Sequence, residues 1–176
     1  MTAIVFIGAR GSGKSTVAGE LGRLLDRPVI DLDAAALQAS GGTSVTGVFE
    51  TAGEPHWRAC EADVLREALA QGDVIIDAGG GVGALDPPRA VLMDAKQAGE
   101  AAVVWLRCSD RVMEARLAAD CGDRPPLQSG DAAREAAEVA AQRSQAYDDA
   151  AEVTFCSDDE LSATAAEIAA WWEART

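Results

Sequence analysis

One glycine-rich segment near the start of the chain restricts the possible folds more than any other feature. It reads Gly8-Ala-Arg-Gly-Ser-Gly-Lys-Ser15 and matches the pattern G-x-x-x-x-G-K-[ST]. The apolar run Ala3–Ile7 precedes it, and residues 14–26 follow with apolar side chains at helical spacing. A strand, a glycine loop and a helix in this order predict a parallel α/β sheet with the loop at its edge.

The same loop contains the residue types that bind nucleotide phosphates. Its glycines let backbone N–H groups surround phosphate oxygens, and the N-terminus of the following helix adds a favourable dipole. Lys14 is expected to reach the β- and γ-phosphates, and the Ser15 hydroxyl is expected to bind Mg²⁺. The expected ATP-binding residues of the loop are Gly11, Ser12, Gly13, Lys14, Ser15 and Thr16. An ordinary glycine turn is the alternative interpretation.

Apolar runs alternate with helix-like stretches along the rest of the chain. We expect strands at 28–30, 74–76, 103–106 and 153–155, and helices at 54–71, 87–97, 109–119, 131–149 and 158–174. The alternation predicts a three-layer αβα fold with a five-stranded, mainly parallel sheet. No repeat or linker divides the 176 residues, so we expect one domain over 1–176 with a lid loop at about 120–130.

The overall charge and the cysteine pattern argue against several classes of protein. The chain has 15 Lys+Arg and 29 Asp+Glu, a net charge of −14, which repels nucleic acid and anionic lipid. Four cysteines without metal-ligand spacing and a single histidine make a zinc site improbable. No basic leader and no run of about 20 apolar residues is present, so we expect a cytoplasmic protein.

Polar and glycine residues follow the predicted strands, and right-handed crossovers place them at the same sheet edge as the phosphate loop. Asp31 and Asp33 follow the second strand, and strand alternation would put both carboxylates on one side. Gly79, Gly80 and Gly81 follow the third strand, where backbone without side chains can approach a ligand closely. Helix capping by Asp33 and a plain flexible glycine turn are the alternatives.

Three arginines that follow the phosphate loop in the sequence are candidates for binding anions. Arg58 lies three residues before Glu61 in a predicted helix, so the two side chains can pair. Arg124 lies in the polar loop, where a lid arginine can swing onto a transferring phosphate. Arg143 lies on the following helix, one turn before Tyr147. A surface salt bridge and a solvated helix charge are the alternatives for Arg58 and Arg143.

Taken together, these segments resemble the shikimate kinase family. The motifs are GARGSGKST, DLD, GEPHWRACE, GGG, DRPPL and RSQAY, in the family's order and at similar spacing. The resemblance implies a nucleoside-monophosphate-kinase-like α/β domain. It implies transfer of the γ-phosphate of Mg-ATP to the 3-hydroxyl of shikimate, on the route to chorismate and the aromatic amino acids. A monomer is the family expectation.

The resemblance also implies a role for each matching residue. Asp33 would bind the substrate hydroxyls, and Arg58 and Arg143 would hold the substrate carboxylate, which a guanidinium binds in bidentate fashion. Phe49 and Trp57 would wall the substrate ring. Gly79, Gly80 and Gly81 would supply backbone contacts.

On the nucleotide side, the resemblance implies that Asp31 supports Mg²⁺ together with Ser15. Arg124 would close over ATP, and Arg116 would lie against adenine. The implied catalytic residues are Lys14, Asp33 and Arg124.

Two of the departures from the family pattern lie close to the expected site. Arg10 occupies a loop position that is apolar in many members and arginine in others, and it is expected to face the acceptor pocket. It would either join Arg58 and Arg143 around shikimate or select a more anionic acceptor. Asp77 is an unexpected acidic residue just before the glycines. A same-fold kinase for another carboxylate-bearing acceptor such as gluconate, and a nucleotide-binding module without catalysis, are the alternatives.

Overall fold

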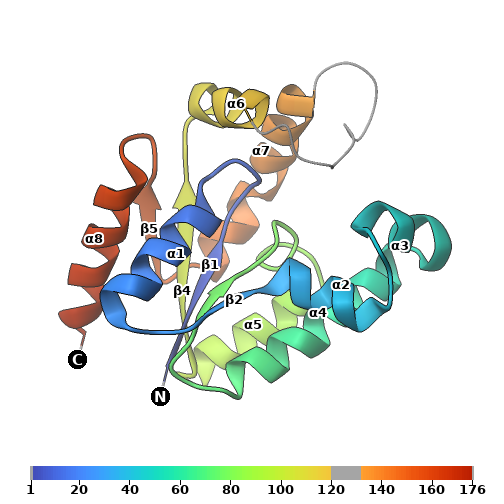
Figure 1. Cartoon of the computed structure of the whole chain (residues 1–176), viewed down its shortest axis with the longest axis horizontal. Helices are drawn as coiled ribbons and strands as arrows, with labels where there is room; N and C mark the ends of the chain where they lie inside the picture. The colour runs from blue at the N-terminus through green and yellow to red at the C-terminus, as the bar shows by residue number, and fades with distance from the viewer. Residues whose placement is uncertain (1, 120–131, 176) are drawn as a thin grey trace.

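The computed structural model describes residues 2–119 and 132–175, and in this part of the chain five parallel strands form one sheet (Figure 1). The strand order is β2-β3-β1-β4-β5. The strands are β1 (Ala3–Ile7), β2 (Val29–Asp31), β3 (Ile75–Asp77), β4 (Ala101–Arg107) and β5 (Val153–Cys156). The predicted fold class is therefore confirmed, and each expected strand is present with its ends shifted by at most two residues.

Helices cover both faces of the sheet, as Figure 1 shows. They are α1 (Lys14–Leu25), α2 (Leu32–Ser40), α3 (Val45–Ala52), α4 (Glu54–Leu69), α5 (Pro88–Gln97), α6 (Asp110–Ala119), α7 (Ala132–Ala150) and α8 (Leu161–Glu173). Helices α1 and α8 pack on one face, and α4, α5 and α7 contribute to the core on the other. Within the described residues, no helix combines the length and apolar character needed to cross a membrane.

The central strand β1 shows why the chain begins with an unbroken apolar run. Ile4 and Phe6 belong to the core shared with α1 and α8, whereas Val5 and Ile7 belong to the core on the opposite face. All four side chains are fully buried. A strand covered on both faces needs apolar residues at every position, and each buried side chain contributes roughly 1.5–3 kcal/mol.

One expectation about the second strand was wrong. Strand β2 ends at Asp31 and α2 begins at Leu32, so strand alternation does not apply to Asp33. Asp31, rather than Asp33, is the helix cap, because its carboxylate accepts a hydrogen bond of 3.0 Å from the Ala34 N–H. The two aspartates nevertheless lie at the same sheet edge, Asp31 at the end of the strand and Asp33 in the first turn of the helix.

Helix α3 was missed in the sequence pattern. It has eight residues and begins after Ser44, whose hydroxyl accepts a hydrogen bond of 3.1 Å from the Gly47 N–H. Glycine and β-branched residues in this segment lower its helix propensity, so tertiary packing decides its structure. Buried Val48 packs into the core, and partly buried Val45 and Phe49 pack against it.

The tryptophan pair near the end of the chain belongs to the packing of α8. Trp172 is 7% exposed and lies in the core with α1. The guanidinium of Arg27 lies 4.8 Å from the Trp172 ring centroid, within cation–π range. Trp171 contacts Phe155 edge to face at 6.2 Å, which ties α8 to β5.

Candidate active site

The phosphate loop connects β1 to α1 and holds Lys14 in a fixed position. Gly11 and Gly13 have φ values of 82° and 86°, which side-chain-bearing residues rarely adopt. The buried Lys14 Nζ donates hydrogen bonds of 2.9 Å to the carbonyls of Gly8 and Ala9. The lysine is thus folded back over its own loop at the N-terminus of α1, where phosphates bind.

A cavity of about 700 Å³ opens beside this loop and contains most of the predicted site. The predicted residues that line it are Arg10, Gly11, Gly13, Lys14, Ser15, Thr16, Asp31, Asp33, Gly79, Gly80 and Arg116. The residues predicted to bind phosphate therefore share one cavity with four of those predicted to bind the acceptor, Arg10, Asp33, Gly79 and Gly80. The other predicted acceptor residues, Phe49, Trp57, Arg58, Gly81 and Arg143, are not among its lining residues.

Arg116 lies at one end of this cavity and is held by backbone groups. Its guanidinium donates to the carbonyl of Ser157 and, at 3.4 Å, to the carbonyl of Gly11. Leu161 packs close to Gly13 beside it. A guanidinium plane can stack on a flat aromatic ring, and the contact of Arg116 with adenine stays a prediction.

The run of three glycines after β3 is crowded by the protein's own side chains. A methyl group on Gly79 would overlap Asp33 Oδ1, and one on Gly81 would overlap Arg58 Nη1. Neither residue has a positive φ, so space rather than backbone conformation requires glycine here. The run brings a carboxylate of α2 and a guanidinium of α4 against the same short stretch of backbone.

Helix α7 contacts the middle glycine of the run. The Arg143 Nη1 donates a 3.0 Å hydrogen bond to the Gly80 carbonyl, and the Tyr147 hydroxyl donates to the same oxygen. Tyr147 is 1% exposed, and this burial raises the pKa of its hydroxyl, so it remains a donor at neutral pH. Tyr147 thus holds the Gly80 carbonyl from α7, a contact that the sequence did not reveal.

Arg58 forms the predicted ion pair with Glu61. Its Nη1 lies 2.6 Å from Glu61 and its Nη2 lies 2.7 Å from Glu54. Burial raises the pKa of Glu61, and the charge of Arg58 opposes this effect. Burial alone would lower the pKa of Arg58, but the two carboxylates outweigh it and keep the guanidinium charged.

The predicted aromatic wall is formed by two rings in edge-to-face contact. Phe49 of α3 and Trp57 of α4 have centroids 6.1 Å apart at an interplanar angle of 75°. Trp57 is 2% exposed and belongs to the core, whereas Phe49 is partly exposed. Their contact with a substrate ring stays a prediction.

The cavity beside the phosphate loop is also lined by a carboxylate to which the sequence assigned no role. Asp77 ends β3 and is the register partner of Asp31 on β2. Burial raises the pKa of this carboxyl group, and the nearby Ser15 hydroxyl and Lys14 ammonium oppose that rise. Among residues 2–119 and 132–175, no three ligating side chains converge on one point.

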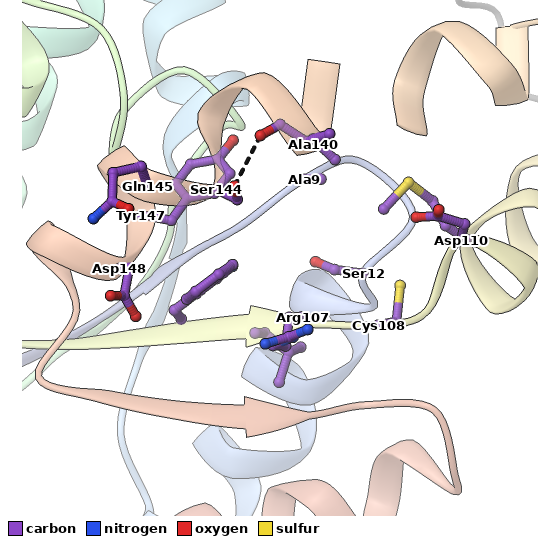
Figure 2. A pocket seen from close by; sticks show the side chains of 14 residues that line it. Ala9, Ser12, Arg107, Cys108, Asp110, Ala140, Ser144, Gln145, Tyr147 and Asp148 are labelled. Atoms are coloured by element: carbon purple, nitrogen blue, oxygen red, sulfur yellow. Dashed lines mark hydrogen bonds between the residues drawn. The ribbon is translucent and has the colours of Figure 1, made fainter. Parts of the chain in front are cut away.

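A second cavity of about 440 Å³ lies on the other side of the phosphate loop, and Figure 2 shows its lining. Ser144 and Tyr147 of α7 face Ser12 and Cys108 across it. Ser12 therefore lines this second cavity and not the cavity that is lined by Lys14. Burial raises the pKa of the Cys108 thiol, which makes it a weak nucleophile.

Comparison with known proteins identifies the family of this fold and site. The family model described as shikimate kinase matches residues 10–173. A shikimate kinase from Nitrobacter winogradskyi is 32% identical over 156 residues, which cover 89% of this chain and 69% of that protein. One from Halorhodospira halophila is 35% identical, covering 85% and 81%. The chain belongs to the shikimate kinase family.

A solved structure agrees with this assignment. The shikimate kinase of Acinetobacter baumannii, determined in complex with shikimate, superposes with a TM-score of 0.86 and 25% identity. The alignment covers 100% of this chain and 95% of that one. As a member of the shikimate kinase family, the chain is an ATP-dependent phosphotransferase, which confirms the predicted enzyme class. The predicted Arg124 and the lid at about 120–130 lie outside the described residues.

Proposed function

We propose that this shikimate kinase family member transfers the γ-phosphate of ATP to the 3-hydroxyl of shikimate, forming shikimate 3-phosphate and ADP. The main support is that Asp33, Arg58 and Arg143 all lie against the run of three glycines, beside the phosphate loop. One carboxylate and two guanidinium groups suit an acceptor with hydroxyls and a carboxylate. We also propose that residues 1–176 act as one domain and as a monomer.

The nucleotide would extend from Arg116 to the phosphate loop. Its phosphates would accept hydrogen bonds from the backbone N–H groups of residues 11–16, and Lys14 would neutralise charge on the transferring group. Ser15 and Asp31 would hold Mg²⁺, whose charge stabilises the β- and γ-oxygens when it is bound. Arg124 would add a further positive charge over the nucleotide.

The acceptor would lie between the glycine run and α4. Arg58 and Arg143 would bind its carboxylate, and Arg10, in the same cavity as Asp33, would add a third positive charge. Asp33 would orient the 3-hydroxyl and take its proton as the oxygen bonds to the γ-phosphorus and ADP leaves. Most of the rate would come from positioning and electrostatics.

ADP release in the presence of Mg-ATP tests the proposal, with shikimate, gluconate, quinate and no acceptor compared. Release that depends on shikimate supports it, and Lys14→Ala provides the inactive control. Release with gluconate or quinate alone would keep the kinase activity and reassign the pocket around Arg10. Nucleotide binding without release under any condition would favour a module without catalysis.

A further inference from the structure

Tyr147 is the single tyrosine of the chain, and its ring and its hydroxyl have different surroundings. The ring belongs to the core and lies 5.9 Å from the Trp105 ring, measured between centroids. A methyl group on Gly83 would meet the Tyr147 ring at 3.0 Å, so the ring is tightly packed. The hydroxyl donates a hydrogen bond to the Gly80 carbonyl. Phenylalanine would fill the same place in the core, so the packing of the fold explains the ring but not the hydroxyl.

The hydroxyl reaches the acceptor side of the molecule only through this carbonyl. Tyr147 lines the second cavity, which Figure 2 shows, and is not among the lining residues of the cavity beside Lys14. Gly80, in contrast, lines the cavity that also contains Asp33. Any effect of the tyrosine on a bound acceptor therefore passes through Gly80.

A second side chain of α7 donates to the same oxygen. Arg143 lies one turn before Tyr147, and its Nη1 donates a 3.0 Å hydrogen bond to the Gly80 carbonyl. A carbonyl oxygen has two lone pairs, so the two donors use its full capacity. A guanidinium has five N–H donors, and one bond to Gly80 leaves enough of them for a bidentate contact with a carboxylate. Without the tyrosine hydroxyl, the vacant lone pair of Gly80 would compete with the acceptor for those donors.

The peptide unit that Tyr147 holds also lies against the other predicted carboxylate-binding arginine. A peptide unit is planar, so fixing the Gly80 oxygen also fixes the direction of the Gly81 N–H. A methyl group on Gly81 would overlap Arg58 Nη1, which shows how closely this guanidinium approaches the same backbone. The hydroxyl of Tyr147 thus orders the stretch of backbone that Arg58 and Arg143 both contact.

We propose that Tyr147 is a positioning residue for the acceptor, whose hydroxyl fixes the Gly80 carbonyl and directs the Arg143 guanidinium toward the acceptor carboxylate. Tyr147 acts on acceptor binding rather than on the transfer step, because it reaches neither reactant directly. The inference rests on the proposed function, since it requires a carboxylate-bearing acceptor beside Gly80. A neutral hydrogen bond of this kind corresponds to roughly a two- to tenfold change in affinity.

Initial-rate kinetics of Tyr147→Phe test this role, because the substitution keeps the ring and removes only the oxygen. We expect the KM for shikimate to rise roughly two- to tenfold, with kcat and the KM for ATP changed by less than about twofold. Thr164→Val is the matched control, since it removes another buried hydroxyl, on α8 at the opposite face of the sheet, and should leave the KM for shikimate unchanged. A lowered kcat with an unchanged KM for shikimate would overturn the inference.

A double-mutant cycle shows whether the hydroxyl acts through Arg143. In the Arg143→Ala background, Tyr147→Phe should cause no further loss of kcat/KM for shikimate, because the group that the hydroxyl directs is already gone. The same fold-loss in both backgrounds would show that the two side chains act independently, and would overturn the inference.

A spectroscopic signature tests the role in the unmodified chain, whether or not the variants fold. Because Tyr147 is the single tyrosine, protein grown with tyrosine labelled with carbon-13 at Cζ gives one ring resonance. Saturating shikimate, added without nucleotide, should shift this resonance, since the acceptor draws on the guanidinium that shares the Gly80 oxygen with the tyrosine. A resonance that does not move on shikimate binding would show that Tyr147 serves the core alone.

These measurements separate this inference from the proposed function. Wild-type protein that phosphorylates shikimate, together with an unchanged KM in Tyr147→Phe, would refute the role of Tyr147 alone. Wild-type protein that neither binds nor phosphorylates shikimate would refute the proposed function and this role together.

Discussion

The ion pair between Arg58 and Glu61 leads to a quantitative prediction, because the same guanidinium serves the fold and the acceptor. The side chains are 11% and 1% exposed and lie 2.6 Å apart. Arg58→Ala leaves the Glu61 carboxylate buried beside an empty position. Breaking a buried pair in this way costs about 3–5 kcal/mol, a large part of a typical total of about 5–15 kcal/mol.

A double-mutant cycle separates the two roles of Arg58. Glu61→Gln removes the buried charge, so Arg58→Ala/Glu61→Gln should recover much of the free energy of unfolding lost in Arg58→Ala. It should not recover acceptor binding, because the carboxylate of shikimate still lacks its partner. Loss of a charge-assisted hydrogen bond costs about 1.5–3 kcal/mol, so the KM for shikimate should rise roughly ten- to hundredfold.

Urea unfolding and initial-rate kinetics measure the two effects separately. We expect Arg58→Ala and Arg58→Ala/Glu61→Gln to show the same raised KM for shikimate. The two variants should differ in their free energy of unfolding. A double variant with wild-type KM would show that the guanidinium acts only in folding. A change in the KM for ATP alone would show that the acceptor pocket is misplaced.

Three further predictions follow from burial and close contact. Gly79→Ala should displace the substrate-binding carboxylate beside it and lower kcat at least about tenfold, whereas Gly19→Ala, with nothing within 4 Å of the added methyl, should retain activity and gain about 0.5–1 kcal/mol in stability. Because burial raises the pKa of Glu61 above its ordinary value of 4.5, its ionisation destabilises the fold. Thermal melting should therefore show the wild type losing stability relative to Glu61→Gln as the pH rises above 4.5 toward neutrality. Alkylation followed by mass spectrometry at mildly alkaline pH should modify exposed Cys156 faster than Cys108, whose pKa is raised by burial.

The sequence predicted those parts of the molecule that depend on local pattern. The apolar run before Gly8, the glycine spacing and Lys14 predict a strand, loop and helix without any knowledge of distant contacts. The Arg58–Glu61 pair was also predictable, since residues three apart on a helix face each other.

Other features were missed or misread, one at a local helix cap and the rest because they depend on long-range contacts. The position at which β2 gives way to α2 is determined by the Asp31 cap, so the alternation expected for Asp33 was wrong. The crowding of Gly79 and Gly81 depends on side chains from α2 and α4. The pairing of Asp77 with Asp31 depends on the strand order, in which β3 lies between β1 and β2.

Phosphorus-31 NMR of the reaction product tests the central claim most directly. The purified protein is incubated with Mg-ATP and shikimate, and Lys14→Ala is treated in the same way. We predict a new phosphomonoester resonance coupled to the proton on carbon 3 of shikimate, in amounts equal to the ADP formed and absent with the variant. Phosphate on another hydroxyl, or inorganic phosphate alone, would contradict the assignment of acceptor and site.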